Sequence, residues 1–246
     1  MRQKQKLGVN TTQENNHNFT WLKAVYHFHV FHYRMPETAA IAAVTSFVPS
    51  PLTVKMAMVA SLFQIGDTKG VDYISKHLDK VEVKITPSKA AVSFKAFMRY
   101  RSPPAVESEK GLDEAGSYYP NRPHIREYAI FQDYLTVYVK VPEGIKNYAE
   151  KALMNMRYLG SKDSLVTCVE IAEKLPEENK CISEMVSGLP GVVVLLADFK
   201  SDVSISDVEQ LIPGNREENM YEKSKPYTLP GKIKTKGKSK IFVREI

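Results

Sequence analysis

The residues best suited to chemistry lie between Tyr118 and Cys168. Arginine, lysine, tyrosine and glycine are mixed there, without the paired carboxylates or clustered metal ligands that hydrolytic sites require. Cationic side chains bind phosphates, and tyrosine rings stack on bases. This stretch therefore predicts a surface that grips a phosphate backbone and stacks bases.

A glycine bend, defined as residues 160–164 (Gly-Ser-Lys-Asp-Ser), follows a predicted helix and precedes a predicted strand. Its exposed backbone N–H groups, its serine hydroxyls and Lys162 would cradle a phosphate. The alternative is a plain helix C-cap and turn. Arg157 and Tyr158, just upstream, favour the phosphate interpretation.

A long polar excursion, Ser102–His124, is flanked by arginines. A loop of this length is usually functional or disordered. We expect a protruding β-hairpin, or thumb; the alternative is a mobile surface loop. Guanidinium groups gathered at one base would repel each other unless an anion lay among them. The flanking arginines are Arg99, Arg101, Arg122 and Arg126, and the candidates for stacking are Tyr118 and Tyr119.

The histidines suggest two other chemistries. His27 and His29 share one face of a predicted strand, but His32 points away and no cysteine lies near, so we expect no metal site. Metal-free RNA cleavage needs a proton donor and acceptor near neutral pH, which histidine supplies. His29, His32 or His124 could act so, and an endoribonuclease therefore stays as the alternative function.

Composition sets the wider limits. The chain has 246 residues, a formal net charge of +6 and a basic C-terminal stretch, in which Lys223 to Ile246 holds seven lysines and one arginine against one glutamate. Two isolated cysteines indicate neither a zinc site nor a disulfide framework, and predict a reducing, cytoplasmic location. We expect no secretory signal, membrane span or cofactor.

The elements that must position these residues follow from periodicity. Alternating and helical patterns predict Trp21–Arg34 (strand), Leu52–Ile65 (helix), Val81–Ile85 (strand), Val92–Met98 (strand), Leu135–Val141 (strand), Glu143–Met156 (helix) and Ser164–Ile171 (strand). Gly66 would end the first helix and Asp67 would cap a short second one. This order predicts an α+β, ferredoxin-like β-α-β-β-α-β fold of the RNA-recognition type, with an enlarged connection between its second and third strands.

Three regions are therefore expected. Residues 1–18 form a disordered lead-in, residues 19–175 a ferredoxin-like domain with its thumb at about 102–126, and residues 176–246 a less regular C-terminal extension with a basic tail. Within the extension, Val192–Leu196 is expected as a buried strand and Lys240–Ile246 as a terminal one.

At three places the chain resembles the Cas-five family, the fifth CRISPR-associated protein, of the RAMP superfamily. Val48–Met58 is similar to the family's proline-rich turn and first helix, with Met56 where the family has glycine. Arg126-Glu-Tyr running into Leu135–Val139 resembles its post-thumb strand. Arg157–Val166 resembles its Tyr-Leu-Gly segment and is the most specific match.

The resemblance implies a non-catalytic, RNA-binding subunit of a type I CRISPR surveillance complex (Cascade) for antiviral defence. Such a subunit caps the complex, binds the 5′ handle of the CRISPR RNA, and contacts the backbone subunit and the large subunit near the protospacer-adjacent motif of the target DNA. One branch of the family instead cleaves precursor RNA. The RNA-contacting residues expected here are Arg34, Lys55, Arg99, Arg101, Tyr118, Tyr119, Arg122, Arg126, Arg157, Tyr158, Gly160, Ser161, Lys162 and Ser164.

Overall fold

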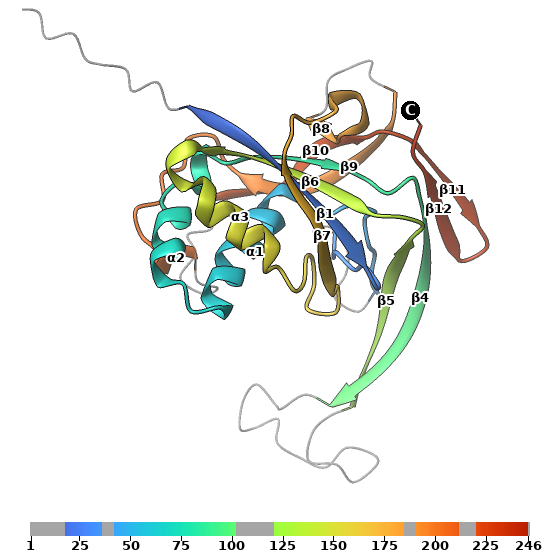
Figure 1. Ribbon diagram of the computed structural model, residues 1–246. Helices are drawn as coiled ribbons and strands as arrows, with labels where there is room; N and C mark the ends of the chain where they lie inside the picture. The colour runs from blue at the N-terminus through green and yellow to red at the C-terminus, as the bar shows by residue number, and fades with distance from the viewer. Residues whose placement is uncertain (1–17, 36–41, 102–120, 185–189, 212–219, 246) are drawn as a thin grey trace, which may run out of the picture.

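The computed structural model describes residues 18–35, 42–101, 121–184, 190–211 and 220–245. It has a mixed α+β fold of mostly antiparallel strands, so the expected fold class is confirmed at that level (Figure 1). Nearly all of the expected lead-in and most of the expected thumb lie outside the described residues. None of the helices in the described ranges is long and apolar enough to cross a membrane.

The first sheet has four antiparallel strands in the order β3-β6-β1-β7. Its strands are β1 (Phe19–Phe28), β3 (Glu82–Thr86), β6 (Leu135–Pro142) and β7 (Val166–Glu173). Strand β1 is central, since it pairs with β6 along one edge and with β7 along the other. Leu22, Ala24 and Tyr26 on its one face are fully buried.

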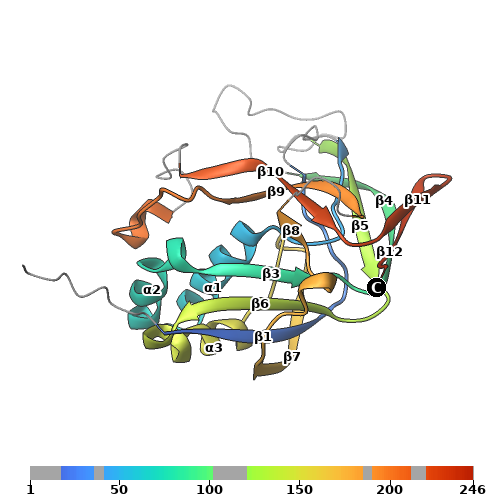
Figure 2. The ribbon, with the colours of Figure 1, turned by 90° about the horizontal axis from the view of Figure 1, so that it is seen from above.

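Helices pack beside this sheet. The α-helices are α1 (Pro51–Gln64), α2 (Thr68–Ser75) and α3 (Lys146–Met154), and the short 3-10 turns are η1 (Leu78–Lys80), η3 (Glu143–Ile145), η4 (Glu178–Lys180) and η5 (Val208–Leu211). Helix α1 contacts β3 on one side and β9 (Val192–Phe199) on the other, so it lies between two sheets (Figure 2).

Local capping sets the ends of α1 and the start of α2. The Ser50 hydroxyl accepts a hydrogen bond from the Thr53 N–H at 3.1 Å, with Pro51 in the first helical position. Gly66, at φ +74°, follows the last turn of α1. The Asp67 carboxylate then accepts from the Gly70 N–H at 2.9 Å and caps α2. The predicted stop of the first helix at Gly66 and the predicted cap of the second at Asp67 are thus confirmed.

Two further sheets complete the fold. One has the order β11-β12-β4-β5-β2 and the other the order β8-β10-β9. Their strands, apart from β9, are β2 (Ala42–Ala43), β4 (Ala90–Arg101), β5 (Asn121–Phe131), β8 (Ser183–Glu184), β10 (Tyr221–Leu229), β11 (Lys232–Lys236) and β12 (Ser239–Val243). Strands β4 and β5 form a long hairpin that extends away from the helices (Figure 1).

Two expectations about the strands of the first 175 residues need correction. The first strand ends at Phe28 rather than Arg34, because Phe31 leaves the first sheet and exchanges backbone hydrogen bonds with Ala129 of β5 at 2.8 Å. The post-thumb match is two strands, β5 and β6, because Asp133 holds a turn between them by accepting from the Ser88 hydroxyl and the Lys89 N–H.

The C-terminal extension is more regular than expected. Val192–Leu196 lies in the longer strand β9, and the basic stretch from Lys223 lies in strands β10, β11 and β12 rather than in a loose tail. The reason is that β12 pairs with β4 through Ile241↔Val92 and Val243↔Ala90, which attaches the chain end to the hairpin sheet.

Candidate nucleic-acid interface

The register of the β4–β5 hairpin places the backbones of the four flanking arginines. Arg99 pairs with Pro123 and Arg101 with Asn121, whereas Arg122 pairs with Tyr100 and Arg126 with Ala96. Among these four arginines, the structure describes the side chain of Arg126. The expectation of four guanidinium groups gathered at one place stays a prediction.

Arg126 joins the hairpin to the glycine bend. Its Nη1 lies 2.6 Å from Oδ2 of Asp163, and the Arg126 side chain is still 30% exposed. The Tyr128 hydroxyl donates to the same Asp163 oxygen at 3.2 Å. Burial raises the pKa of Tyr128, so this hydroxyl keeps its proton and remains a donor. The two segments that the sequence singled out thus meet at one carboxylate.

A set of hydrogen bonds centred on His32 holds the bend in shape. The carbonyl oxygen of His32 accepts from the Ser161 N–H at 2.9 Å and from the Ser164 hydroxyl at 3.0 Å. The N–H of His32 donates back to the Ser164 hydroxyl oxygen at 2.8 Å. Gly160 has φ +115°, and a Cβ there would lie 2.8 Å from the same carbonyl oxygen. The close approach therefore requires glycine.

Several of the expected RNA contacts are exposed on or near this bend. Arg157 and Lys162 are exposed, while Tyr158, Gly160 and Ser161 are half-buried. The Tyr158 hydroxyl accepts from the Gln64 side chain at 3.1 Å. Arg34 is exposed at a bridge to Thr45, in the segment that follows His32. These groups leave a cationic surface beside the Arg126–Asp163 pair.

Two expected contacts are buried and engaged inside the protein. Lys55 is 5% exposed, and its ammonium lies 2.8 Å from Oδ1 of Asp198 and over the ring of Phe199. Ser164 is fully buried, and its hydroxyl is used by the hydrogen bonds to His32. Neither side chain is available to a phosphate, and both are withdrawn from the interface.

The remaining expected residues are only partly placed. The backbones of Arg99, Arg101 and Arg122 lie in the β4–β5 ladder. Tyr118 and Tyr119 fall outside the described residues.

An open pocket of about 410 Å³ lies beside the bend. Its lining includes Leu52 and Met56 of α1, Tyr158 and Gly160, and Leu211 of η5. The first and third matched motifs therefore contribute to one mainly apolar pocket. Met56, which stands where the family has glycine, is part of its wall.

The candidate histidines whose side chains the structure describes differ in exposure. His27 and His29 are exposed with their ring centroids 5.1 Å apart, whereas His32 is buried with Nδ1 2.8 Å from the Glu127 carbonyl oxygen. Burial lowers the pKa of His32, which favours a neutral ring. A buried ring held by a backbone carbonyl does not reach an RNA 2′-hydroxyl.

Sequence reasoning missed Asp163 and Tyr128 as partners of Arg126. Tyr128 lies two positions after Arg126, so the two side chains share one face of β5. This spacing could have predicted their proximity once β5 was identified as a strand. Asp163 carried no signal, because its partner lies 37 residues away.

Comparison with known proteins supports the resemblance. No protein-family model matches the chain. It is 25% identical over 239 residues to the CRISPR-associated protein Cas5 of Archaeoglobus fulgidus, covering 90% of this chain and 97% of that protein. The similar solved structures include a CRISPR protein from Archaeoglobus fulgidus (TM-score 0.43, 15% identity, 93% of both chains) and a chain of a CRISPR RNA-guided surveillance complex (TM-score 0.41, 10% identity, 93% of this chain and 89% of that chain). The resemblance indicated by the three motifs is thereby confirmed: over most of its length, this chain is similar to a CRISPR-associated protein Cas5.

Proposed function

We propose that this protein is a non-catalytic RNA-binding subunit of a type I CRISPR surveillance complex, and that it holds the 5′ handle of the CRISPR RNA. The observation that carries the proposal is the meeting of the glycine bend with the hairpin base at Arg126 and Asp163, in a chain similar to a Cas5 protein. Single-stranded RNA is recognised through phosphate contacts and splayed bases, which suits a cationic bend beside a pocket.

The domain organisation belongs to the same proposal. Strands β1, β3, β6 and β7 with helices α1 and α3 follow the order β-α-β-β-α-β, which supports a ferredoxin-like domain over residues 19–175. The β4–β5 hairpin is then the thumb inserted between its second and third strands. Residues 176–246 form an extension that joins the thumb sheet through β12.

The proposed contacts to the handle are the cations and the backbone of the bend. Arg126, Arg157 and Lys162 would bind phosphates, with Arg34 nearby, and the Gly160 backbone N–H and the Ser161 hydroxyl would donate hydrogen bonds beside Tyr158. Arg99, Arg101, Arg122, Tyr118 and Tyr119 stay predicted contacts of the thumb. Contacts to a backbone subunit, a large subunit and target DNA near the protospacer-adjacent motif, and a cytoplasmic location, are part of the proposal.

A pair of variants tests the central contact. Arg126→Ala and Asp163→Asn both break the 2.6 Å ion pair, so a purely structural role of that pair would make both variants weaken RNA binding together. If Arg126 binds a phosphate in competition with Asp163, the two variants act in opposite directions. Arg126→Ala then weakens binding to handle RNA and lowers the salt slope by about 0.7 to 1. Asp163→Asn strengthens binding, because it removes a competing anion.

Fluorescence anisotropy with RNA that carries the repeat-derived handle measures both effects over a series of salt concentrations. A shift in the same direction for both variants, or a salt slope that Arg126→Ala leaves unchanged, would contradict the assignment.

The alternative of an endoribonuclease is tested separately. Purified protein is incubated with repeat RNA with and without EDTA, and the products are resolved on a gel. We expect intact RNA. Site-specific cutting that His29→Ala or His124→Ala abolishes would replace the non-catalytic proposal with the enzymatic one.

A further inference from the structure

The basic C-terminal stretch is held as an ordered hairpin at the edge of a sheet. Strands β11 and β12 pair from Lys232↔Val243 to Lys236↔Ser239, and Gly237 and Lys238 form the turn between them. Gly237 has φ +62°, which suits glycine in the first central position of a type II′ turn. Strand β11 is the outermost strand of the five-stranded sheet. The lysines are therefore fixed by backbone pairing.

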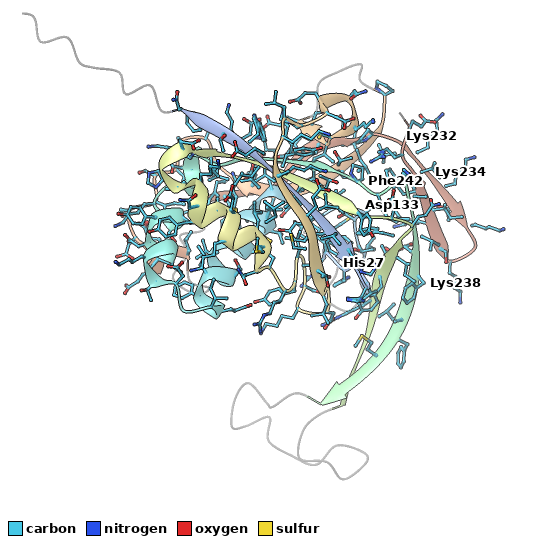
Figure 3. All side chains as sticks on the ribbon, in the orientation of Figure 1. His27, Asp133, Lys232, Lys234, Lys238 and Phe242 are labelled. Carbon is cyan, nitrogen blue, oxygen red and sulfur yellow. The ribbon has the colours of Figure 1, made fainter. Side chains whose placement is uncertain are left out.

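Alternation places the lysines of β11 in a row. Lys232, Lys234 and Lys236 share one face of the strand, and successive members are separated by about 7 Å along it. Lys238 continues the series in the turn, and all four side chains are exposed. Figure 3 shows Lys232, Lys234 and Lys238 pointing away from the body of the protein. We call Lys234, Lys236 and Lys238 the lysine row.

The charges of the lysine row are not compensated. Lys232 lies 2.5 Å from Glu245, but within the described ranges Lys234, Lys236 and Lys238 have no acidic partner. Elsewhere lysines such as Lys23 bind carboxylates directly. Like charges fixed side by side raise the local positive potential, which attracts a polyanion.

The same face of the sheet carries exposed apolar side chains. The pairings Lys234↔Ile241, Ile241↔Val92, Val92↔Ile130 and Phe94↔Tyr128 put these positions on the side of the lysine row. Val92, Phe94, Ile130 and Val243 there are 38–48% exposed. An open hollow of about 210 Å³ lies among Val92, Ile130 and Ile241. The sheet therefore presents an apolar surface with a cationic edge.

We propose that this face of the five-stranded sheet binds single-stranded nucleic acid. The lysine row holds successive phosphates, and the unpaired bases lie across Val92 and Phe94 toward the hollow. A single strand fits better than a duplex, because only unstacked bases can cover apolar side chains, whereas a duplex buries its bases. The binding is independent of sequence, and its phosphate contacts come from the β11–β12 hairpin rather than from the glycine bend, so it does not depend on the proposed handle contact.

A second explanation could account for the presence of the lysine row on β11. Lysines on an edge strand also prevent two sheets from pairing edge to edge. That role predicts self-association when the lysines are neutralised, with no effect on nucleic-acid binding.

The test uses the full chain with the triple substitution Lys234→Gln, Lys236→Gln and Lys238→Gln. The probes are fluorescent RNA and DNA single strands about 20 nucleotides long, without handle sequence, and a DNA duplex of equal length. With about 0.7 units of salt slope per single-strand contact, three contacts give about 2 units. Between about 50 and 200 mM salt, the affinity of the wild type should therefore fall by a factor roughly 20 times larger than that of the variant. Comparing the RNA and DNA strands shows which of the two nucleic acids this face prefers.

The matched control is Lys69→Gln, Lys80→Gln and Lys200→Gln. These lysines are exposed, lack an acidic partner among the described residues, and do not form a row. The control keeps the wild-type slope, while Lys236→Gln alone loses about 0.7 units. An unchanged slope in the triple variant, a change confined to the duplex, or self-association without a change in slope would overturn the proposal. Because the probes lack the handle, such a failure would leave the proposal for Arg126 untouched.

Discussion

Replacing Gly160 by alanine tests whether the close contact at the bend shapes this part of the protein. Gly160 has φ +115°, and an added Cβ would lie 2.8 Å from the His32 carbonyl oxygen and 3.3 Å from a ring carbon of Phe31. The carbonyl oxygen belongs to the backbone and cannot rotate away. We therefore expect the bend to move as a unit in Gly160→Ala.

Two effects should lower the unfolding free energy of Gly160→Ala. A non-glycine residue with positive φ costs about 1–2 kcal/mol. Displacing the bend also weakens the hydrogen bonds that the Ser161 N–H and the Ser164 hydroxyl donate to His32, at about 0.5–1.5 kcal/mol each. The variant should lose about 2–5 kcal/mol of unfolding free energy, which lowers the melting temperature by roughly 5–15 °C.

Gly66→Ala is the matched control. Gly66 also has positive φ, at +74°, but a Cβ added there would have no other atom within 4 Å. This variant carries the backbone cost of about 1–2 kcal/mol without the collision. Urea unfolding of both proteins measures the difference, and handle binding below the melting temperature reports on the shape of the bend. If Gly160→Ala is no less stable than Gly66→Ala, the close approach does not hold the bend and the reasoning fails.

Two further predictions concern stability. Lys55→Met leaves the carboxylate of Asp198, which is 16% exposed, without its cation, and should lower the unfolding free energy measured in urea by roughly 3 kcal/mol. The control Lys84→Met, whose partner Glu178 is exposed, should lower it by less than about 1 kcal/mol. Equal losses would refute a structural role for Lys55. Burial lowers the pKa of His32 below its value of 6.5 in the unfolded chain. Below pH 6.5 the unfolded chain therefore binds a proton at His32 that the folded protein does not bind. The contribution of His32 to stability is complete above pH 6.5 and is lost as the pH falls. Urea midpoints at several pH values should show this loss in the wild type and a smaller one in His32→Gln, and an identical pH dependence would contradict it.

The sequence was informative wherever the signal lies within a few residues. Alternation in Leu135–Val141 predicted β6, and Gly66 predicted the end of α1. Two strand regions were not predicted correctly, for different reasons. Strand β5 begins at Asn121, inside a polar segment that contains Pro123 and carries no alternating apolar pattern. The order of the C-terminal stretch comes from pairing with β4, which no local pattern encodes.

The sequence alone determined the class of the fold, the resemblance to Cas5 and the segments that carry the candidate contacts, because periodicity, caps and short motifs act over one or two turns of chain. The tertiary structure decided how those contacts combine. It joined Arg126 to Asp163 and took Lys55 into an ion pair with Asp198, 143 residues away. A strand register and a long-range ion pair depend on the packing of the whole chain, and a shift of one residue in the register of β5 would turn Arg126 to the other face of the strand.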